Sequence, residues 1–192
     1  AVGSQFVSIK GHTDTILCVA FDPKGEYLAS SSADGTVRIW DIVLEPKLVK
    51  TIHVCGRVAP GSAQVLGFSW HPNGDSLAIP KGSTVAIHER GTWEASSEFR
   101  GGHIRDVCVC AYSPNGRYLA SAGLDKQVFV WDVNDTDSLD RHKGDATPCG
   151  LTWSPIGNSL AFLDDSGQLA MWAMPIPSHY PSPFGDADAV AD

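Results

Sequence analysis

The chain has 192 residues, of which 43% are hydrophobic and 19% charged, a composition typical of a protein with a packed core. Its 14 basic and 22 acidic residues give a net charge of −8, which argues against a general nucleic-acid or anionic membrane surface, since both need a basic field. No apolar run reaches the ~18–20 residues of a membrane-spanning helix, so we expect neither a direct nucleic-acid site nor a membrane contact in this chain.

The N-terminal segment indicates that the sequence is a piece of a longer polypeptide. It begins with Ala1 in place of an initiator Met, and residues 1–5 lack the basic and apolar stretches of a signal peptide. Gln5–Ile9 is expected to form the outermost strand of a preceding sheet whose inner strands are missing.

Residues 11–42 predict three short strands. Val19 and Phe21 alternate with small or polar residues, which is the period of a strand with one face against a neighbour. A Pro-x-Gly step that begins at Pro23 then turns the chain, because Pro fixes φ and Gly permits positive φ. An Ala-Asp-Gly turn leads into the third strand, which ends at Trp40.

The same pattern recurs along the chain. Gly11-His12 and Trp40-Asp41 return as Gly102-His103 and Trp131-Asp132, 91 residues later and without a gap. The repeat copies lie near residues 11–42, 63–89, 102–133 and 147–173, the second and fourth being weaker. Their Pro anchors (Pro23, Pro72, Pro114 and Pro155) are 41 to 49 residues apart, which suits the ~40–45 residues of a four-stranded propeller blade.

Two segments between the copies are unusually long, Val43–Ala63 and Asn134–Thr147. We expect them to be loops, and loops around a rigid scaffold are where propellers bind partners. Residues 175–192 form a Pro-rich acidic tail without Lys or Arg, which is expected to be a linker; a peptide ligand for some partner is the alternative.

Four polar or aromatic residue types recur at matching places in the two regular copies. They are His12, Ser30, Asp34 and Trp40 in the first, and His103, Ser121, Asp125 and Trp131 in the third. This signature resembles the WD-repeat family, in which such residues form a hydrogen-bonded network inside a blade. An imidazole can donate to a carboxylate and accept from a hydroxyl, whereas an indole only donates. A catalytic Ser-His-Asp set is disfavoured, since a set repeated in two copies and tied to turns indicates architecture.

Other chemistry finds little support in the sequence. Five Cys residues without a Cys-x-x-Cys pair predict neither a disulfide framework nor a zinc site. Asp164-Asp165-Ser166-Gly167 is interpreted as a hairpin turn rather than a carboxylate pair. No nucleophile elbow, phosphate loop, zinc-protease helix or calcium loop occurs. We therefore expect no enzyme, no catalytic residue, no metal and no cofactor.

The predicted fold is all-β, a WD-repeat β-propeller with about four blades in residues 1–174. It is expected to be the C-terminal part of a seven-bladed ring, the blade number that the resemblance implies. Four blades in an open arc would expose the apolar faces of the first and last sheets.

The two irregular copies carry a more specific resemblance. Phe68-Ser69-Trp70-His71-Pro72 and Cys149-Gly150-Leu151-Thr152-Trp153-Ser154-Pro155 are similar to the N-terminal propeller of a replisome adaptor family. That family includes chromosome transmission fidelity factor four in yeast and the WD-repeat and HMG-box DNA-binding protein, or acidic nucleoplasmic DNA-binding protein, in animals. The resemblance runs from about Ser4 to Trp172.

This resemblance implies a nuclear, non-enzymatic scaffold that links the replicative helicase to DNA polymerase alpha, contacts chromatin factors and supports sister-chromatid cohesion. The family's trimerisation region and its HMG box have no counterpart in this sequence. The alternative is another WD-repeat adaptor, such as a substrate receptor of a cullin ubiquitin ligase or a histone-tail reader. Such receptors often carry Trp-Asp-x-Arg, but Val43 and Asn134 stand where that Arg would be.

Overall fold

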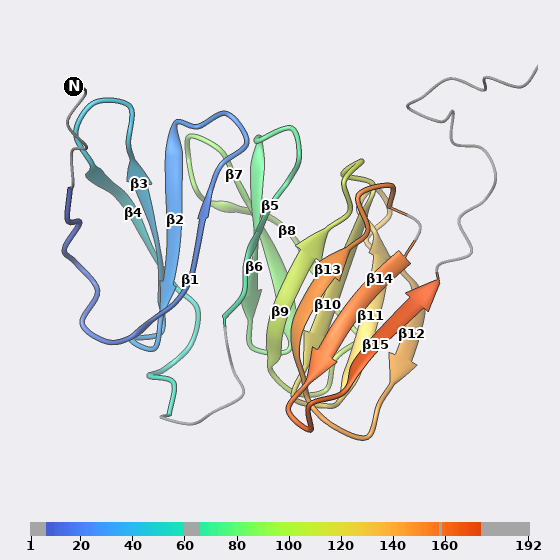
Figure 1. Ribbon diagram of the computed structural model, residues 1–192. Coiled ribbons are helices and arrows are strands. Elements are labelled where there is room, and N and C mark those ends of the chain that lie inside the picture. Colours follow the sequence, from blue (N-terminus) through green and yellow to red (C-terminus); the bar gives the residue numbers. More distant parts are fainter. Residues whose placement is uncertain (1–6, 60–65, 158, 174–192) are drawn as a thin grey trace, which may run out of the picture.

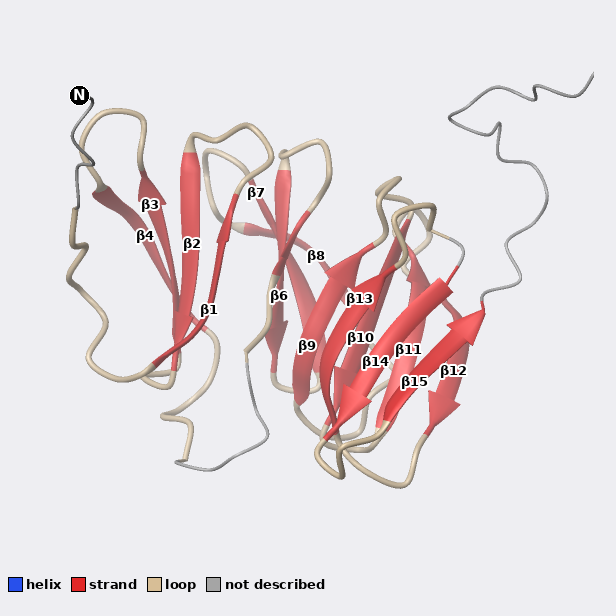
Figure 2. Cartoon of the chain, in the orientation of Figure 1, coloured by secondary structure: helices blue, strands red, loops and turns tan. Residues whose placement is uncertain are grey.

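The computed structural model describes residues 7–59, 66–157 and 159–173, and within them the chain forms strands, turns and loops but no helix (Figures 1 and 2). The strands make four antiparallel sheets, each built from consecutive strands. The prediction of an all-β, four-bladed propeller arrangement is therefore confirmed. Since these ranges hold no helix, they contain none that could cross a membrane.

The sheets are numbered here in chain order. Sheet 1 holds β1 (Ile16–Phe21), β2 (Tyr27–Ser32), β3 (Thr36–Asp41) and β4 (Lys47–His53). Sheet 2 holds β5 (Ser69–Trp70), β6 (Ser76–Lys81), β7 (Thr84–Glu89) and β8 (Ala95–Phe99). Sheet 3 holds β9 (Val107–Tyr112), β10 (Tyr118–Gly123), β11 (Gln127–Asp132) and β12 (Ser138–Lys143). Sheet 4 holds β13 (Pro148–Trp153), β14 (Ser159–Asp164) and β15 (Leu169–Ala173).

Side chains close the turns that the Pro-x-Gly steps predict. After β1, the Asp22 carboxylate accepts hydrogen bonds from the backbone N–H groups of Glu26 (2.8 Å) and Tyr27 (2.7 Å). Gly25, in the same turn, has a φ of 72°, a conformation that glycine adopts without strain. In sheet 3 the Ser113 hydroxyl replaces the carboxylate and accepts from the N–H of Tyr118 at 2.9 Å.

Two expectations are wrong, one about the segments between the copies and one about the segment before the first copy. Val43–Ala63 and Asn134–Thr147 are not simply loops, because they contain β4 and β12, the outermost strands of sheets 1 and 3. Val7–Ile9 is not a strand, and Gln5 and Phe6 lie outside the described residues. The tail at 175–192 also lies outside them.

The core consists of three layers of side chains, each between two neighbouring sheets. Val37 and Ile39 of sheet 1 pack with Leu77 and Ile79 of sheet 2. The other face of sheet 2 packs on sheet 3, and the other face of sheet 3 packs on sheet 4. Sheets 2 and 3 are buried on both sides, because successive residues of a strand point to opposite faces and each face packs on a neighbouring sheet. Sheets 1 and 4 each keep one uncovered face.

Polar contacts also join the sheets. Arg90 of sheet 2 donates to the buried Asp22 carboxylate of sheet 1 at 2.8 Å and to the Gly74 carbonyl at 2.8 Å. It also pairs with Glu26, and its guanidinium lies 4.7 Å from the centre of the Tyr27 ring. This residue therefore fixes the relative position of the first two sheets.

Candidate interaction face

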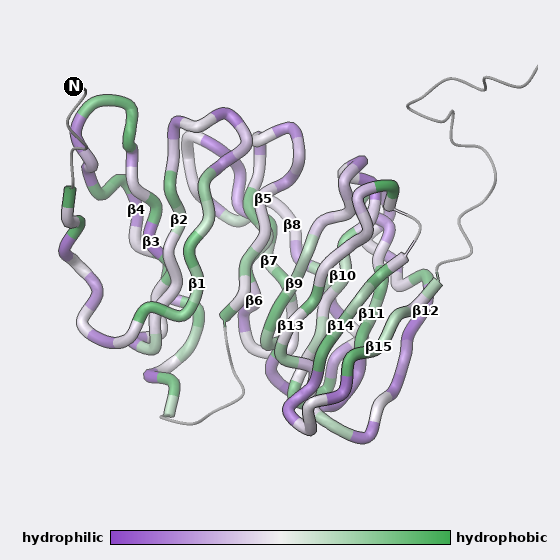
Figure 3. Tube along the Cα trace, viewed as in Figure 1, coloured by the Kyte–Doolittle hydropathy of each residue, from purple (hydrophilic) through white to green (hydrophobic). Residues whose placement is uncertain are grey.

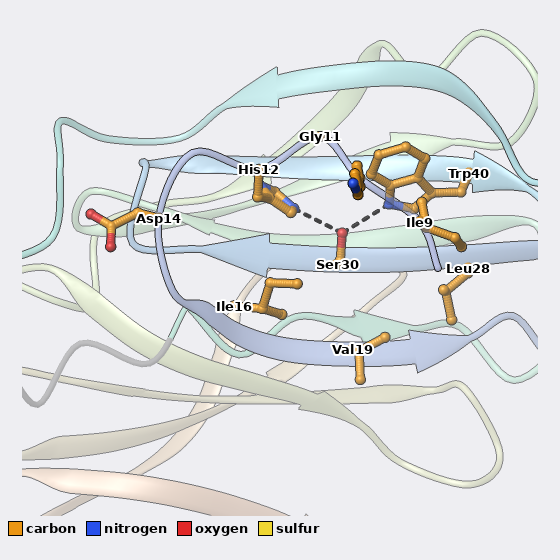
Figure 4. A pocket seen from close by; sticks show the side chains of 10 residues that line it. Ile9, Gly11, His12, Asp14, Ile16, Val19, Leu28, Ser30 and Trp40 are labelled. Atoms are coloured by element: carbon orange, nitrogen blue, oxygen red, sulfur yellow. Dashed lines mark hydrogen bonds between the residues drawn. The ribbon is translucent and has the colours of Figure 1, made fainter. Parts of the chain in front are cut away.

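The four signature residues of sheet 1 meet through their side chains. His12 precedes β1, Ser30 lies on β2, Asp34 in the following turn and Trp40 on β3. The His12 Nδ1 lies 2.9 Å from an Asp34 carboxylate oxygen, and its Nε2 lies 2.8 Å from the Ser30 hydroxyl. The Trp40 indole donates to the same hydroxyl at 2.9 Å (Figure 4). Since a carboxylate only accepts, Nδ1 carries the proton and Nε2 accepts from Ser30.

The four residues of sheet 3 repeat this arrangement. His103 lies 3.0 Å from Asp125 and 2.8 Å from the Ser121 hydroxyl, and the Trp131 indole donates to that hydroxyl at 2.8 Å. The structure thus brings all eight predicted residues together as two sets of four. Both serines are buried and take part in two hydrogen bonds each, so neither hydroxyl is presented as a nucleophile.

Burial and hydrogen bonding set the charge states of these groups. Burial is the largest influence on the His103 imidazole and lowers its pKa, which favours a neutral ring. Burial also disfavours the Asp125 carboxylate, but hydrogen bonds from His103 and the Ile104 N–H outweigh it, and the pKa is lowered. The pKa of Asp34 lies well below its usual range for similar reasons, with Thr36 and His12 donating against the effect of burial. The set of sheet 3 therefore holds a neutral imidazole against a carboxylate.

Sheets 2 and 4 lack the full set. In sheet 2 His88 takes the place of the Trp; it is buried, and its Nδ1 donates to the Trp93 carbonyl at 3.1 Å. Each of these sheets instead uses a β-strand Trp to reach the sheet before it. The Trp70 indole donates to the Ala20 carbonyl at 3.2 Å, and the Trp153 indole donates to the Ala111 carbonyl at 3.0 Å. Sequence reasoning missed this paired contact.

The uncovered face of sheet 1 carries a hollow of about 480 Å³ over the hydrogen-bonded set. Ile16, Val19 and Leu28 line it beside His12 and Trp40, as Figure 4 shows. Val19 and Ile16 are exposed, and hydrophobic residues run along β1 in Figure 3. The hollow is therefore open and largely apolar, with the hydrogen-bonded set at its floor, which makes it a candidate interaction face.

A second exposed apolar feature is the hairpin between β3 and β4. Val43 and Leu44 are exposed there, and a hollow of about 680 Å³ lies beside them. Asp41, Glu45 and Lys47 complete its lining, so its rim is charged.

Comparison with known proteins identifies the family of this fold. The family described as the WDHD1 first WD40 domain matches residues 1–171. The chain belongs to this family.

Of three individual relatives, the first agrees with the WDHD1 family. WD repeat and HMG-box DNA-binding protein 1 of Mus musculus is 32% identical over 178 residues, which is 88% of this chain and 16% of the relative. A chromatin assembly factor 1 subunit of Gallus gallus is 26% identical over 163 residues, 83% of this chain and 24% of the relative. F-box-like/WD repeat-containing protein TBL1X of Macaca fascicularis is 26% identical over 177 residues, 88% and 30% of the two chains. The chain spans less than a third of each of these relatives.

The cysteines of this WDHD1-family chain are free thiols. Cys108 and Cys110 are buried, and burial raises the pKa of Cys108 to about 12, which disfavours the reactive thiolate. In the described ranges, no group of three or more His, Cys, Asp or Glu residues is placed to hold a metal ion. Asp164 lies at the end of β14 and accepts from the Gln168 N–H, within the hairpin turn before β15.

Proposed function

We propose that this chain is a non-enzymatic scaffold and adaptor module of a nuclear protein that acts in DNA replication and on chromatin. In this proposal the whole protein links the replicative helicase to DNA polymerase alpha and supports sister-chromatid cohesion. The observation that carries it is the match to the WDHD1 first WD40 domain over residues 1–171. A relative named as a chromatin assembly factor subunit supports the chromatin setting.

The geometry supports a binding rather than a catalytic role. Among the described residues, the two sets that resemble a catalytic Ser-His-Asp arrangement each have a buried serine already bonded to an indole and an imidazole. A substrate would have to break those hydrogen bonds to reach Ser30 or Ser121. The uncovered sheet faces, the outermost strands and the hairpin tips remain accessible.

The charge supports protein partners over DNA for this module. A net charge of −8 repels a phosphate backbone, so contact with DNA is assigned to other parts of the whole protein. The partners of the module are then polymerase alpha, helicase subunits or chromatin factors.

Affinity purification of the full-length protein from S-phase cells tests this function. The proposal predicts that polymerase alpha and helicase subunits are recovered with the full-length protein. It also predicts that they are no longer recovered when residues 1–171 are deleted, which would place the contact in this module. An unrelated WD-repeat protein with the same tag is the control for nonspecific capture. Recovery of cullin adaptors in place of replication proteins would contradict the proposal.

That contrary outcome corresponds to a second candidate, a substrate receptor of a ubiquitin ligase. The similarity to an F-box-like WD-repeat protein, 26% over 177 residues, favours it. The higher identity to the HMG-box relative, 32% over 178 residues, and the missing Arg after both Trp-Asp pairs favour the replication adaptor.

A further inference from the structure

The β3–β4 hairpin carries two apolar side chains at its tip, Val43 and Leu44, which we call the apolar tip. Val43 is 62% exposed and Leu44 92%, and the turn between β3 and β4 is hydrophobic in Figure 3. Leu48 and Val49, at the start of β4, are also exposed. Sheet 1 therefore presents apolar side chains at the end of a hairpin as well as on its uncovered face.

The corresponding hairpin of sheet 3 has the same backbone construction. The Val43 N–H donates to the Asp41 carboxylate at 3.0 Å, and the Asn134 N–H donates to the Asp132 carboxylate at 3.0 Å. The residue before each of these donors bonds through its own N–H to a carbonyl of the turn between the first two strands of its sheet, at 3.0 Å in sheet 1 and 2.8 Å in sheet 3. Val43 therefore corresponds to Asn134, 91 residues later.

The turns of sheets 2 and 3 show that this position faces solvent when a preceding sheet is in place. Asn134 and Asp135 are exposed although sheet 2 packs on sheet 3. Gly91 and Thr92, in the turn between β7 and β8, are exposed although sheet 1 packs on sheet 2. The exposure of the apolar tip is therefore a property of the hairpin and does not depend on which sheet packs beside it.

The same comparison shows that the hairpin does not need apolar residues at its tip. Sheet 3 forms the turn with Asn134 and Asp135, and sheet 2 forms it with Gly91 and Thr92. Adjacent exposed apolar side chains with a polar rim are typical of a protein contact. The apolar tip is thus better explained by binding than by folding.

The hollow beside the tip indicates the chemistry of a partner. It measures about 680 Å³, within the ~300–1,000 Å³ of ligand sites. Its charged lining is two carboxylates, Asp41 and Glu45, against the single ammonium of Lys47. This excess has the same sign as the net charge of −8 on the whole chain. A segment that carries Lys or Arg is therefore attracted to the hollow, and an acidic segment is repelled.

We propose that the apolar tip and its hollow are a docking site for a short partner segment that carries Lys or Arg next to apolar side chains. The backbone bonds of the hairpin hold the tip in place, so little order has to be gained on binding. This inference rests on the proposed function only in that the module binds proteins, and it does not depend on which protein is bound.

Photocrosslinking of the full-length protein in S-phase cells tests the site. Leu44→p-benzoylphenylalanine places a photoreactive group at the tip, and Asp135→p-benzoylphenylalanine places it on the equivalent turn of sheet 3 as the matched control. We expect at least about tenfold more adduct with another protein from position 44 than from position 135. The attached peptide, sequenced by mass spectrometry, is expected to carry Lys or Arg beside apolar residues. An adduct within the protein itself, an acidic peptide, or equal yields from the two positions would overturn the proposal.

Substitutions at the site test its chemistry without a crosslinker. Leu44→Ser is expected to lower the recovery of the identified partner in affinity purification at least about tenfold, because a buried apolar side chain is lost from the contact. Glu45→Lys is expected to lower recovery, whereas Lys47→Glu is expected to maintain or raise it. Equal effects of the two charge reversals, or the opposite order, would contradict a basic partner segment.

The identity of the crosslinked protein separates this inference from the proposed function. A basic segment of a cullin adaptor attached at position 44 would support the docking site and contradict the replication role. Recovery of polymerase alpha without an adduct at position 44 would overturn the docking site and leave the replication role in place.

Discussion

Ser121 holds two buried partners at once, the imidazole of His103 and the indole of Trp131. We predict that Ser121→Ala lowers the free energy of unfolding by about 2–4 kcal/mol, because two buried groups each lose a bond at ~1–3 kcal/mol. Denaturant unfolding monitored by tryptophan fluorescence measures the change. Ser97→Ala on the exposed outer strand β8 is the control and should have little effect. An equal, small effect of both substitutions would contradict a stabilising role for the hydrogen-bonded set.

The two buried histidines predict that the free energy of unfolding falls on acidification at pH values above those at which carboxylates titrate. Burial is the largest influence on both His103 and His88 and lowers the pKa of each below its unfolded value. Their contribution to stability is therefore fully present above the unfolded pKa of ~6.5 and is lost as the pH falls toward the folded pKa. Asp34 and Asp125 have lowered folded pKa values, so their contribution is lost only at pH values below ~4.

We therefore predict that the free energy of unfolding falls between about pH 7.5 and about pH 5.5. His103→Gln keeps hydrogen-bonding capacity without a titrating group, and it should reduce this pH dependence. Denaturant unfolding series at several pH values measure both effects. A wild-type stability that is constant across this range would contradict a neutral, buried His103.

At the scale of elements, the contrast between two ion pairs tests how the sheets are joined. The carboxylate of Asp22 is fully buried, and Arg90 neutralises it across the boundary between sheets 1 and 2. Lys24 and Asp75 lie 2.6 Å apart across the same boundary, but both are exposed. We predict that Arg90→Gln destabilises the chain by about 2 kcal/mol, whereas Lys24→Gln changes stability by less than about 0.5 kcal/mol. Thermal and denaturant unfolding of the two variants check this. Equal effects would show that burial does not decide the strength of this link.

Three strands of each sheet could be predicted from the sequence, but the fourth strands of sheets 1, 2 and 3 could not. The inner strands carry apolar or small residues because at least one of their faces packs on a neighbouring sheet, continuously where both faces are buried and at every second residue where one is. All six residues of β12 are exposed, so no apolar period marks it, and hydrogen bonding to β11 alone defines it. The same holds in part for β4, which made Val43–Ala63 look like a loop.

The residues of the two hydrogen-bonded sets could be predicted from the sequence, because identical residue types recur in the first and third copies at an offset of 91 residues. What the sequence did not reveal is that Trp70 and Trp153 reach back to the preceding sheet, since that contact depends on how neighbouring sheets stack. His71, just before the Pro-x-Gly turn of the second copy, makes a further contact that the sequence does not predict. In the structure its Nε2 also lies 3.1 Å from the Gly116 carbonyl of the next sheet.

The whole molecule is a stack in which each sheet contacts only its neighbours, so each end presents half of a contact. The order of the sheets, rather than any single residue, makes Phe21 exposed while its counterpart Tyr112 is buried.

Amide hydrogen exchange at Cys110 and Tyr112 tests most directly whether neighbouring sheets stack as the structure shows. The Cys110 N–H donates to the Gly67 carbonyl at 2.8 Å, and the Tyr112 N–H donates to the Ser69 hydroxyl at 3.0 Å, both across the contact between sheets 2 and 3. We predict that both amides exchange slowly, at rates close to those of the paired strand amides of sheet 3. Fast exchange at both amides, while the paired amides of β9 and β10 stay protected, would contradict the account.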